Sequence, residues 1–132
     1  MPKKKVTFDV VREIGLALPD VVASTMYGSP ALKLHGNLLT CMAIHKSVEP
    51  ETLVVCIDFE QRAALLTEAP ETYYLTDHYV NYPSVLVRLP RILVDQLRDL
   101  LRSAWRFVAA QKPRTTSRRS VPTVVKTRRR RQ

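Results

Sequence analysis

Glycine is scarce in this chain, whose 132 residues include only Gly15, Gly28 and Gly36. Three isolated glycines make no glycine-rich loop of the kind that cradles a phosphate, so the common nucleotide-binding motifs are excluded. Apolar runs are also short, and none approaches the 18 or so residues that a membrane-spanning helix needs. The N-terminal lysines are not followed by an apolar segment, so the sequence predicts neither a secretion signal nor membrane association.

Cysteine and histidine are sparse as well. Cys41 and Cys56 lie in separate apolar runs without a C-x-x-C spacing, and His35, His45 and His78 lack the spacing of metal ligands. Free cysteines in apolar runs pack as small hydrophobic side chains. We therefore expect two reduced thiols, a cytoplasmic location, no metal site and no cofactor.

A catalytic constellation is also missing. Four tyrosines gather around Asp77-His78, and an Asp-His pair is one way to build a general base. Neighbouring residues of an extended segment point to opposite faces, however, and no serine or cysteine completes a nucleophile motif. We expect a binding protein and not an enzyme, with the tyrosines packed along the rim of a sheet; a ligand-facing aromatic pocket there is the alternative.

Charge is divided sharply along the chain. Nine of the 21 Lys and Arg residues follow residue 111, where there is no Asp or Glu. The remaining twelve cations are balanced by the twelve acidic residues, so residues 1–111 carry no formal net charge. Residues 112–132 have too little apolar surface and too much like charge to fold alone. The sequence thus predicts a domain at 1–111 and a disordered polybasic tail at 112–132.

Apolar spacing predicts the elements of the domain. Three segments have the 3.6-residue period of a helix, and six short apolar runs bounded by turn residues are typical of strands. We expect Thr7 and Asp58 to cap the first two helices and Pro90 to occupy the first turn of the third. Gly28-Ser-Pro30 and His35-Gly-Asn37 are the expected tight turns. The predicted helices span 7–18, 58–69 and 90–110, and the predicted strands span 21–27, 31–34, 38–44, 53–57, 73–75 and 84–88.

The fold class follows from the order of these elements. One helix, four strands, one helix, two strands and a last helix succeed one another, and successive hairpins imply a mostly antiparallel sheet. A sheet that is apolar on one face must cover that face with helices. The prediction is a two-layer α+β domain with its helices on one face.

Several short motifs resemble the MmcQ/YjbR family from about residue 6 to 110. They are Leu16-Ala-Leu-Pro-Asp20, Tyr27-Gly-Ser-Pro-Ala-Leu-Lys33 with Gly36, Tyr74-Leu-Thr-Asp-His-Tyr79, Asn81-Tyr-Pro83 and Val85-Leu-Val-Arg-Leu89. The resemblance implies a fold related to secretion-chaperone-like domains and a "double wing" DNA-binding role. Asn37, Val80 and Ser84 depart from the family pattern, which more often has Lys, Arg and Trp there. The basic tail is not part of that pattern.

Nucleic acid is the partner that this charge distribution favours, with DNA preferred to RNA. Cations on a flexible arm displace the counterions condensed on a phosphate backbone, and arginine both forks onto phosphates and stacks on bases. In the domain, the hairpin tips near Gly36 and Ser47 are the candidate wings. The expected nucleic-acid-binding residues are Lys33, Lys46, Tyr79, Tyr82, Arg88, Arg118, Arg119, Lys126, Arg128, Arg129, Arg130 and Arg131.

Two other roles stay open at this point. A net-neutral domain of secretion-chaperone-like fold is suited to binding a protein partner, and Val121–Val125 has the character of a strand that adds to a sheet edge. The tail would also bind any polyanion without specificity. Arg98, Arg102 and Arg106 form a stripe on the last helix, but Asp95 and Asp99 are placed to pair with it. Neither the oligomeric state nor a target sequence is predicted.

Overall fold

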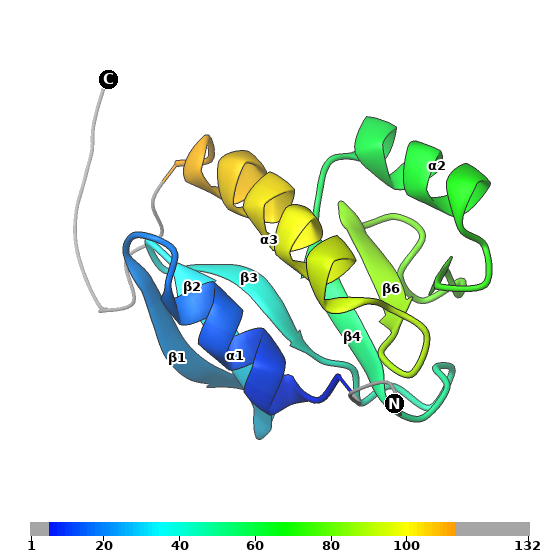
Figure 1. The fold of residues 1–132 in the computed structure, drawn as a ribbon, viewed down its shortest axis with the longest axis horizontal. Helices are drawn as coiled ribbons and strands as arrows, with labels where there is room; N and C mark the ends of the chain where they lie inside the picture. The colour runs from blue at the N-terminus through cyan, green and yellow to red at the C-terminus, as the bar shows by residue number, and fades with distance from the viewer. Residues whose placement is uncertain (1–5, 113–132) are drawn as a thin grey trace, which may run out of the picture.

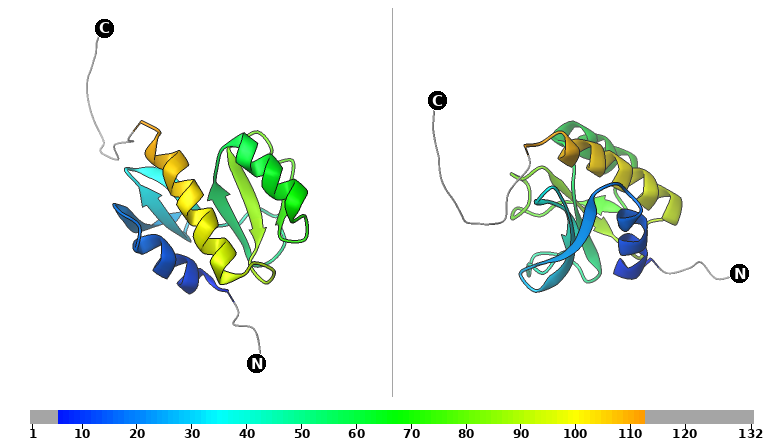
Figure 2. Two further views of the ribbon diagram at one scale, coloured as in Figure 1. Left: turned by 45° about the horizontal axis from the view of Figure 1, so that its top comes forward. Right: turned by 90° about the vertical axis from the view of Figure 1, so that its left-hand side faces the viewer.

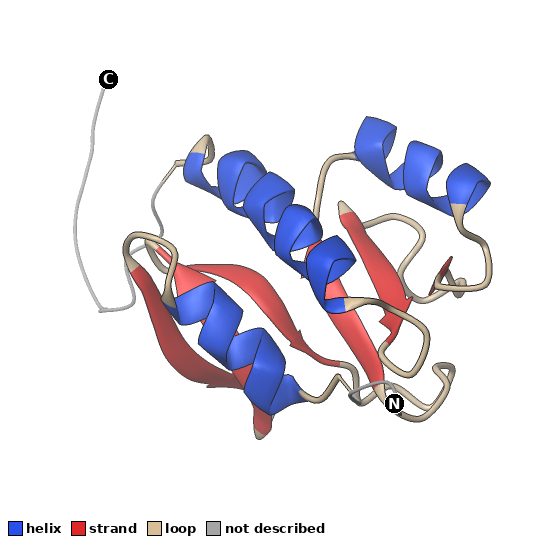
Figure 3. Ribbon diagram, in the orientation of Figure 1, coloured by secondary structure: helices blue, strands red, loops and turns tan. Residues whose placement is uncertain are grey.

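The computed structural model describes residues 6–112 and has the predicted order of elements (Figures 1 and 3). The helices are α1 (Phe8–Leu16), α2 (Phe59–Glu68) and α3 (Val94–Ala109). The strands are β1 (Val21–Met26), β2 (Ser29–Leu34), β3 (Asn37–Met42), β4 (Thr52–Cys56), β5 (Tyr73–Tyr74) and β6 (Ser84–Arg88). None of the helices in this part of the chain is long and apolar enough to cross a membrane.

The strands form one six-stranded antiparallel sheet in the order β1-β2-β3-β4-β6-β5. The last hairpin is therefore inserted so that β6 pairs with β4 and leaves β5 at the edge. All three helices lie on the same side of the sheet, as the edge-on view in Figure 2 shows. The two-layer α+β prediction is confirmed. We call the covered side the helix face and the other side the open face.

The main core lies between the sheet and the helices. Alternate residues of β4 and β6, such as Val55 and Val85, point into it and are fully buried. Leu97 and Leu101 of α3 cover them and are also fully buried. Burying a side chain of this size is worth about 1.5–3 kcal/mol, so this layer supplies most of the driving force for folding.

A β-bulge in β3 decides which residues reach the open face. The pairing of β2 with β3 shifts between Leu32 and Lys33, and Leu39 is the extra residue on β3. A bulge resets the alternation of side chains along its strand. Leu39 consequently joins the main core, while Cys41 lies on the open face beside Ala31.

Two-residue turns of the same kind close the first two hairpins. Tyr27 and Gly28 have φ values of 53° and 82°, and His35 and Gly36 have 52° and 82°. Positive φ at both positions matches the right-handed twist of the flanking strands. The glycine at the second position of each turn adopts this conformation without steric cost.

Three predicted details of these elements are wrong. Ser29-Pro30 belongs to β2 and Asn37 opens β3, so both turns are shorter than expected. Pro30 is tolerated because it pairs with Thr25 of β1 before the pairing of β2 with β3 begins. Pro90 lies in a turn ahead of α3, which begins at Val94.

The predicted helix starts at Thr7 and Asp58 are confirmed. Asp58 accepts a hydrogen bond from the Gln61 backbone N–H at 2.7 Å, an interaction that typically stabilises a helix by about 1 kcal/mol. Thr7 occupies the N-cap of α1 but makes no side-chain cap bond. At α3 the contact is reversed, because the Gln96 side chain accepts a hydrogen bond from the Leu93 backbone N–H.

Candidate functional site

The open face carries a second, smaller apolar cluster. Ala31, Cys41, Val54 and Leu86 form a row across four strands, and each of them is buried although none of the described helices covers this side. Two connecting segments supply the cover, the 43–51 loop after β3 and the 75–83 segment before β6. Side chains from both, including Tyr79, pack on the row. The open face is therefore partly closed by loops.

A groove of about 530 Å³ remains beside these loops. It is lined by Met26, Tyr27, Asn37, Leu38, Cys41, Met42, Ile44, Val54, Cys56, His78, Tyr79, Tyr82, Pro83, Ser84, Phe107 and Gln111. None of these is Asp, Glu, Lys or Arg, so the groove in the described part of the chain has no fixed charge on its walls. Tyr27 at its rim is 86% exposed and Tyr82 is 58% exposed.

The two covering loops are joined by a pair of stacked histidines. The rings of His45 and His78 are 3.7 Å apart and nearly parallel, and Tyr79 meets both edge-on. The Nδ1 atom of His45 accepts a hydrogen bond from the Ser47 backbone N–H at 3.0 Å. The Ser47 hydroxyl in turn lies 2.9 Å from that of Thr76, which closes the link between the loops.

His45 is held in its neutral form by these surroundings. Its pKa is lowered, first by partial desolvation and then by the proximity of His78 and Lys46. An acceptor Nδ1 is also incompatible with the doubly protonated ring. The stacked pair thus joins the 43–51 loop to the 75–83 segment, with His45 in its neutral form. The sequence alone did not indicate this pair, whose members are 33 positions apart.

Arg62 of α2 fixes the backbone of residues 80–84, a segment that supplies part of the groove lining. Its guanidinium donates to the carbonyl oxygens of Val80, Tyr82 and Ser84 at 3.1, 2.8 and 3.3 Å. It also lies over the Phe59 ring, with its central carbon 4.6 Å from the ring centroid. Backbone carbonyls leave no pattern in a sequence, so this role of Arg62 could not be predicted.

Both thiols belong to the groove. Cys41 is buried and Cys56 is half-buried, and both are free, as expected. Burial raises the pKa of Cys41 to about 11. Burial, with a further contribution from Cys41, raises the pKa of Cys56 to about 12. Both side chains are consequently neutral at physiological pH. No cluster of three or more His, Cys, Asp or Glu residues that could hold a metal occurs within residues 6–112.

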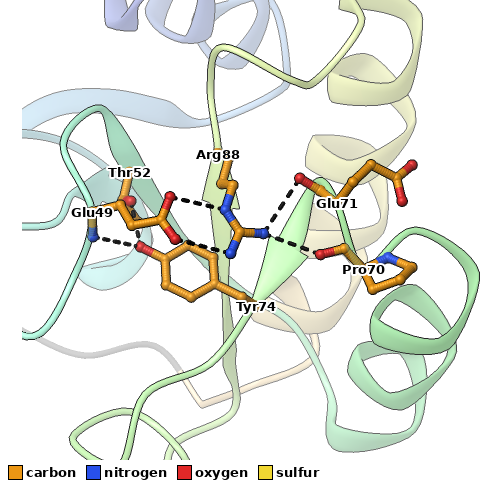
Figure 4. Close-up of polar contacts among 6 residues, drawn as sticks. All are labelled: Glu49, Thr52, Pro70, Glu71, Tyr74 and Arg88. Atoms are coloured by element: carbon orange, nitrogen blue, oxygen red, sulfur yellow. Dashed lines mark hydrogen bonds and ion pairs between the residues drawn. The ribbon is translucent and has the colours of Figure 1, made fainter.

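Arg88 is the centre of a polar cluster at the β5 edge of the sheet (Figure 4). Its Nε and Nη2 each donate to one carboxylate oxygen of Glu49 at 2.9 Å, and Nη1 donates to the Pro70 and Glu71 carbonyls. The guanidinium also lies 4.2 Å from the centroid of the Tyr74 ring. All three of its nitrogens are thus engaged inside the fold. A phosphate contact by Arg88 would require this ion pair to open.

The other expected contacts in the domain are not brought together. Lys33 lies on β2 near the Gly36 turn, whereas Lys46 lies in the loop that follows β3. The two are at opposite ends of β3, a strand of six residues that spans about 20 Å. Tyr79 is half-buried under the histidine pair, and burial raises its pKa. Of the expected aromatic contacts, Tyr82 is the one with a largely exposed ring.

Ion pairs also account for most of the arginine stripe on α3. Asp95 pairs with Arg98 at 3.1 Å, and Asp99 pairs with Arg102 at 3.7 Å, as the sequence indicated. No acidic partner is found for Arg106 among residues 6–112. Surface pairs of this kind contribute at most about 1 kcal/mol, but they neutralise the face on which they lie.

The polybasic residues begin beside the groove. Gln111 lines it, and the carbonyl oxygen of Lys112 accepts a hydrogen bond from the Asn37 side chain at 3.0 Å. The described part of the chain therefore ends next to the start of β3. The remaining expected contacts lie outside the described residues: Arg118, Arg119, Lys126, Arg128, Arg129, Arg130 and Arg131.

Comparison with known proteins adds a fold but no activity. No family model matches the chain. Uncharacterised proteins of Mycobacterium tuberculosis and Mycobacterium bovis are 45% identical over 42 residues, which is 32% of this chain and 33% of each relative. The match therefore spans only about a third of those relatives.

A solved structure covers much more of the domain. The Deinococcus radiodurans protein DR2400, described as a DUF419 domain, superimposes with a TM-score of 0.66 over 81% of each chain. Its sequence is 20% identical to this one. A likeness at that level of identity establishes a common fold, and it leaves the function to be argued from the residues themselves.

Proposed function

We propose that this chain is an MmcQ/YjbR-like protein that binds nucleic acid, DNA in preference to RNA, chiefly through its C-terminal residues. DUF419, the description of the structural neighbour, denotes the YjbR/MmcQ-like family. The observation that carries the proposal is the division of charge. All of the +9 net charge resides after residue 111, on a segment that contains no acidic residue.

The side chains of the domain support a minor role for the domain itself. Arg62 and Arg88 are occupied by contacts within the fold, and Arg12, Arg98 and Arg102 pair with neighbouring carboxylates. Lys33, Lys46 and Tyr82 are the domain residues that we propose as auxiliary contacts to the nucleic-acid backbone. Most of the affinity comes from Arg118, Arg119, Lys126 and Arg128–Arg131, and it is independent of sequence.

Binding of a fluorescein-labelled DNA duplex, measured by anisotropy from 50 to 300 mM salt, tests the proposal on residues 1–132 and 1–111. The full chain is expected to bind with a log–log salt slope of roughly −4 if about half of its terminal cations engage phosphates, and 1–111 is expected to bind far more weakly. Equal affinity of the two forms would mean that residues 1–111 bind the DNA without the C-terminal residues. No binding by either would contradict the proposal.

A protein-binding module is the second candidate, because β1 is an edge strand of the sheet that residues 6–112 form. It pairs with β2 on one side only, and Val22 in its middle is 55% exposed. An exposed edge of this kind can accept a strand from a partner chain. Retention of a partner by 1–111, together with loss of DNA binding on truncation, would favour this second role for the domain.

A further inference from the structure

One buried hydroxyl on the open face has no hydrogen-bond partner among residues 6–112. Ser84 begins β6 and is 4% exposed, and its Oγ makes no hydrogen bond to any described residue. Val85 points into the main core, so the Ser84 side chain lies on the open face, in line with Leu86. Buried hydroxyls in folded proteins almost always have a partner, so an unpaired one calls for an explanation.

The surroundings of this hydroxyl are those of a ligand site. Ser84 lines the 530 Å³ groove, a size within the usual range for small-molecule pockets. The floor is apolar, with Leu38, Cys41 and Val54, and both thiols in the lining are neutral. An apolar floor with a few polar side chains, here Ser84 with Asn37 and Gln111 among them, is the common composition of small-molecule sites.

We propose that the groove on the open face binds a small, uncharged, mainly apolar molecule that carries one hydrogen-bond acceptor, which Ser84 Oγ contacts. A charged group would be desolvated here without a counter-charge, because no Asp, Glu, Lys or Arg is among the described lining residues. A nucleic-acid backbone is excluded from the groove for the same reason. An extended peptide is disfavoured because the floor is the face of a sheet, whose backbone groups are already paired.

The groove is also held open by contacts within the domain. Arg62 fixes the backbone from Val80 to Ser84 through three hydrogen bonds, and the His45–His78 stack fixes the opposite loop. A ligand therefore enters a site whose walls are already ordered, which lowers the entropy cost of binding. This inference does not depend on the proposed binding of nucleic acid.

Two matched aromatic compounds test the proposal on the full chain. 2-Acetylnaphthalene carries a carbonyl oxygen that can accept a hydrogen bond, and 2-ethylnaphthalene has the same ring system and a similar shape without that oxygen. Binding is followed by NMR of ¹³C-labelled methionine methyl groups, because Met26 and Met42 both line the groove. A second cavity of the domain, 340 Å³ between α2 and α3, has no methionine in its lining.

Both compounds are expected to shift the Met26 and Met42 signals, with 2-acetylnaphthalene binding more tightly. Ser84→Ala should weaken 2-acetylnaphthalene by about fivefold, the usual worth of one hydrogen bond, and leave 2-ethylnaphthalene unchanged. Ser84→Thr keeps the hydroxyl and should retain the preference. Ser103→Ala, which removes a hydroxyl from the lining of the second cavity, is the matched control and should change neither affinity.

Failure of both compounds to move the two methionine signals would overturn the proposal. It would equally be overturned if Ser84→Ala weakened the two compounds alike, since the hydroxyl would then have no part in recognition. Melting temperatures of the ligand-free variants show whether a loss of binding comes from a loss of folding. Ser84→Ala removes an unpaired buried hydroxyl and is expected to fold at least as stably as the natural chain.

Discussion

The guanidinium of Arg88 binds the carboxylate of Glu49 through two parallel hydrogen bonds of 2.9 Å, although the two residues are 39 positions apart. This pair ties the 43–51 loop to β6. The Tyr74 hydroxyl joins the same cluster, since it accepts a hydrogen bond from the Glu49 backbone N–H at 2.8 Å and lies 2.6 Å from the Thr52 hydroxyl. Arg88 thus holds the 43–51 loop, which partly covers the open face, against the β5 edge of the sheet.

We expect Arg88→Met to lower the free energy of unfolding by about 1.5–3 kcal/mol, because it removes charge-assisted hydrogen bonds from a side chain that is three-quarters buried. Urea denaturation measures the change. Arg91→Met is the control, since no ion pair to Arg91 is found among the described residues. In the folded variant, DNA affinity should match that of the natural chain. A large loss of affinity with unchanged stability would instead make Arg88 a phosphate contact.

Acid should weaken the contact between the 43–51 loop and the 75–83 segment that the stacked rings of His45 and His78 make. The pKa of His45 is lowered in the fold, whereas an unfolded chain restores its ordinary value of 6.5. The unfolded state therefore binds the proton first. The stability that His45 contributes is complete above about pH 6.5 and is lost as the pH falls through that value towards the lower pKa of the fold. Melting temperatures between pH 8 and pH 5 should fall accordingly.

His45→Asn provides the specific control for that acid effect. An asparagine oxygen can accept the Ser47 N–H as Nδ1 does, but it does not titrate. The variant should show a shallower fall in melting temperature between pH 7 and pH 5. If its profile in this range coincides with that of the natural chain, another group is responsible for the acid sensitivity.

The two thiols should react slowly in the native protein. With pKa values raised to about 11 and about 12, Cys41 and Cys56 hold almost no thiolate at pH 8. Thiolate is the nucleophile, so alkylation by N-ethylmaleimide should be much slower in buffer than in urea. Cys41→Ser and Cys56→Ser assign the two rates. Native rates equal to those in urea would contradict the burial of this face.

The same thiols predict a loss of stability in alkali. Because the fold raises the pKa of each, an unfolded thiol ionises from its ordinary value of 9.0 upward while the folded one stays neutral. Their contribution is therefore complete below about pH 9 and declines as the pH rises above it. The Cys41→Ser and Cys56→Ser variants should show less of this decline in melting temperature.

Local sequence signals predicted the elements well because the causes of those elements are local. Asp58 with Gln61 marked a helix start, and the run Leu53–Ile57 marked a strand buried on both faces. The misplaced start of α3 shows the limit of such signals. Pro90 is compatible with a first helical turn, but the chain makes a further turn before Val94.

The site was less predictable because its contacts are not local. Insertion of β6 between β4 and β5 brings Arg88 to Glu49, and the bulge at Leu39 turns Cys41 to the open face. Neither event has a signature in the residues involved. Tyr79 was expected at the rim of the sheet, whereas it packs on the apolar row that crosses the open face. Its burial against His45 and His78 depends on two loops that meet only in the folded chain.

The central claim is that the terminal arginines, and not the domain, supply the affinity for nucleic acid. The most direct test is the salt dependence of DNA binding by the full chain and by a variant in which Arg128–Arg131 are changed to Gln. Each phosphate contact contributes about −0.9 to the log–log slope, so losing as many as four contacts should reduce its magnitude by up to about 3.6, equally for unrelated duplex sequences. An unchanged slope and affinity would contradict the account, because Arg128–Arg131 would then make no phosphate contacts.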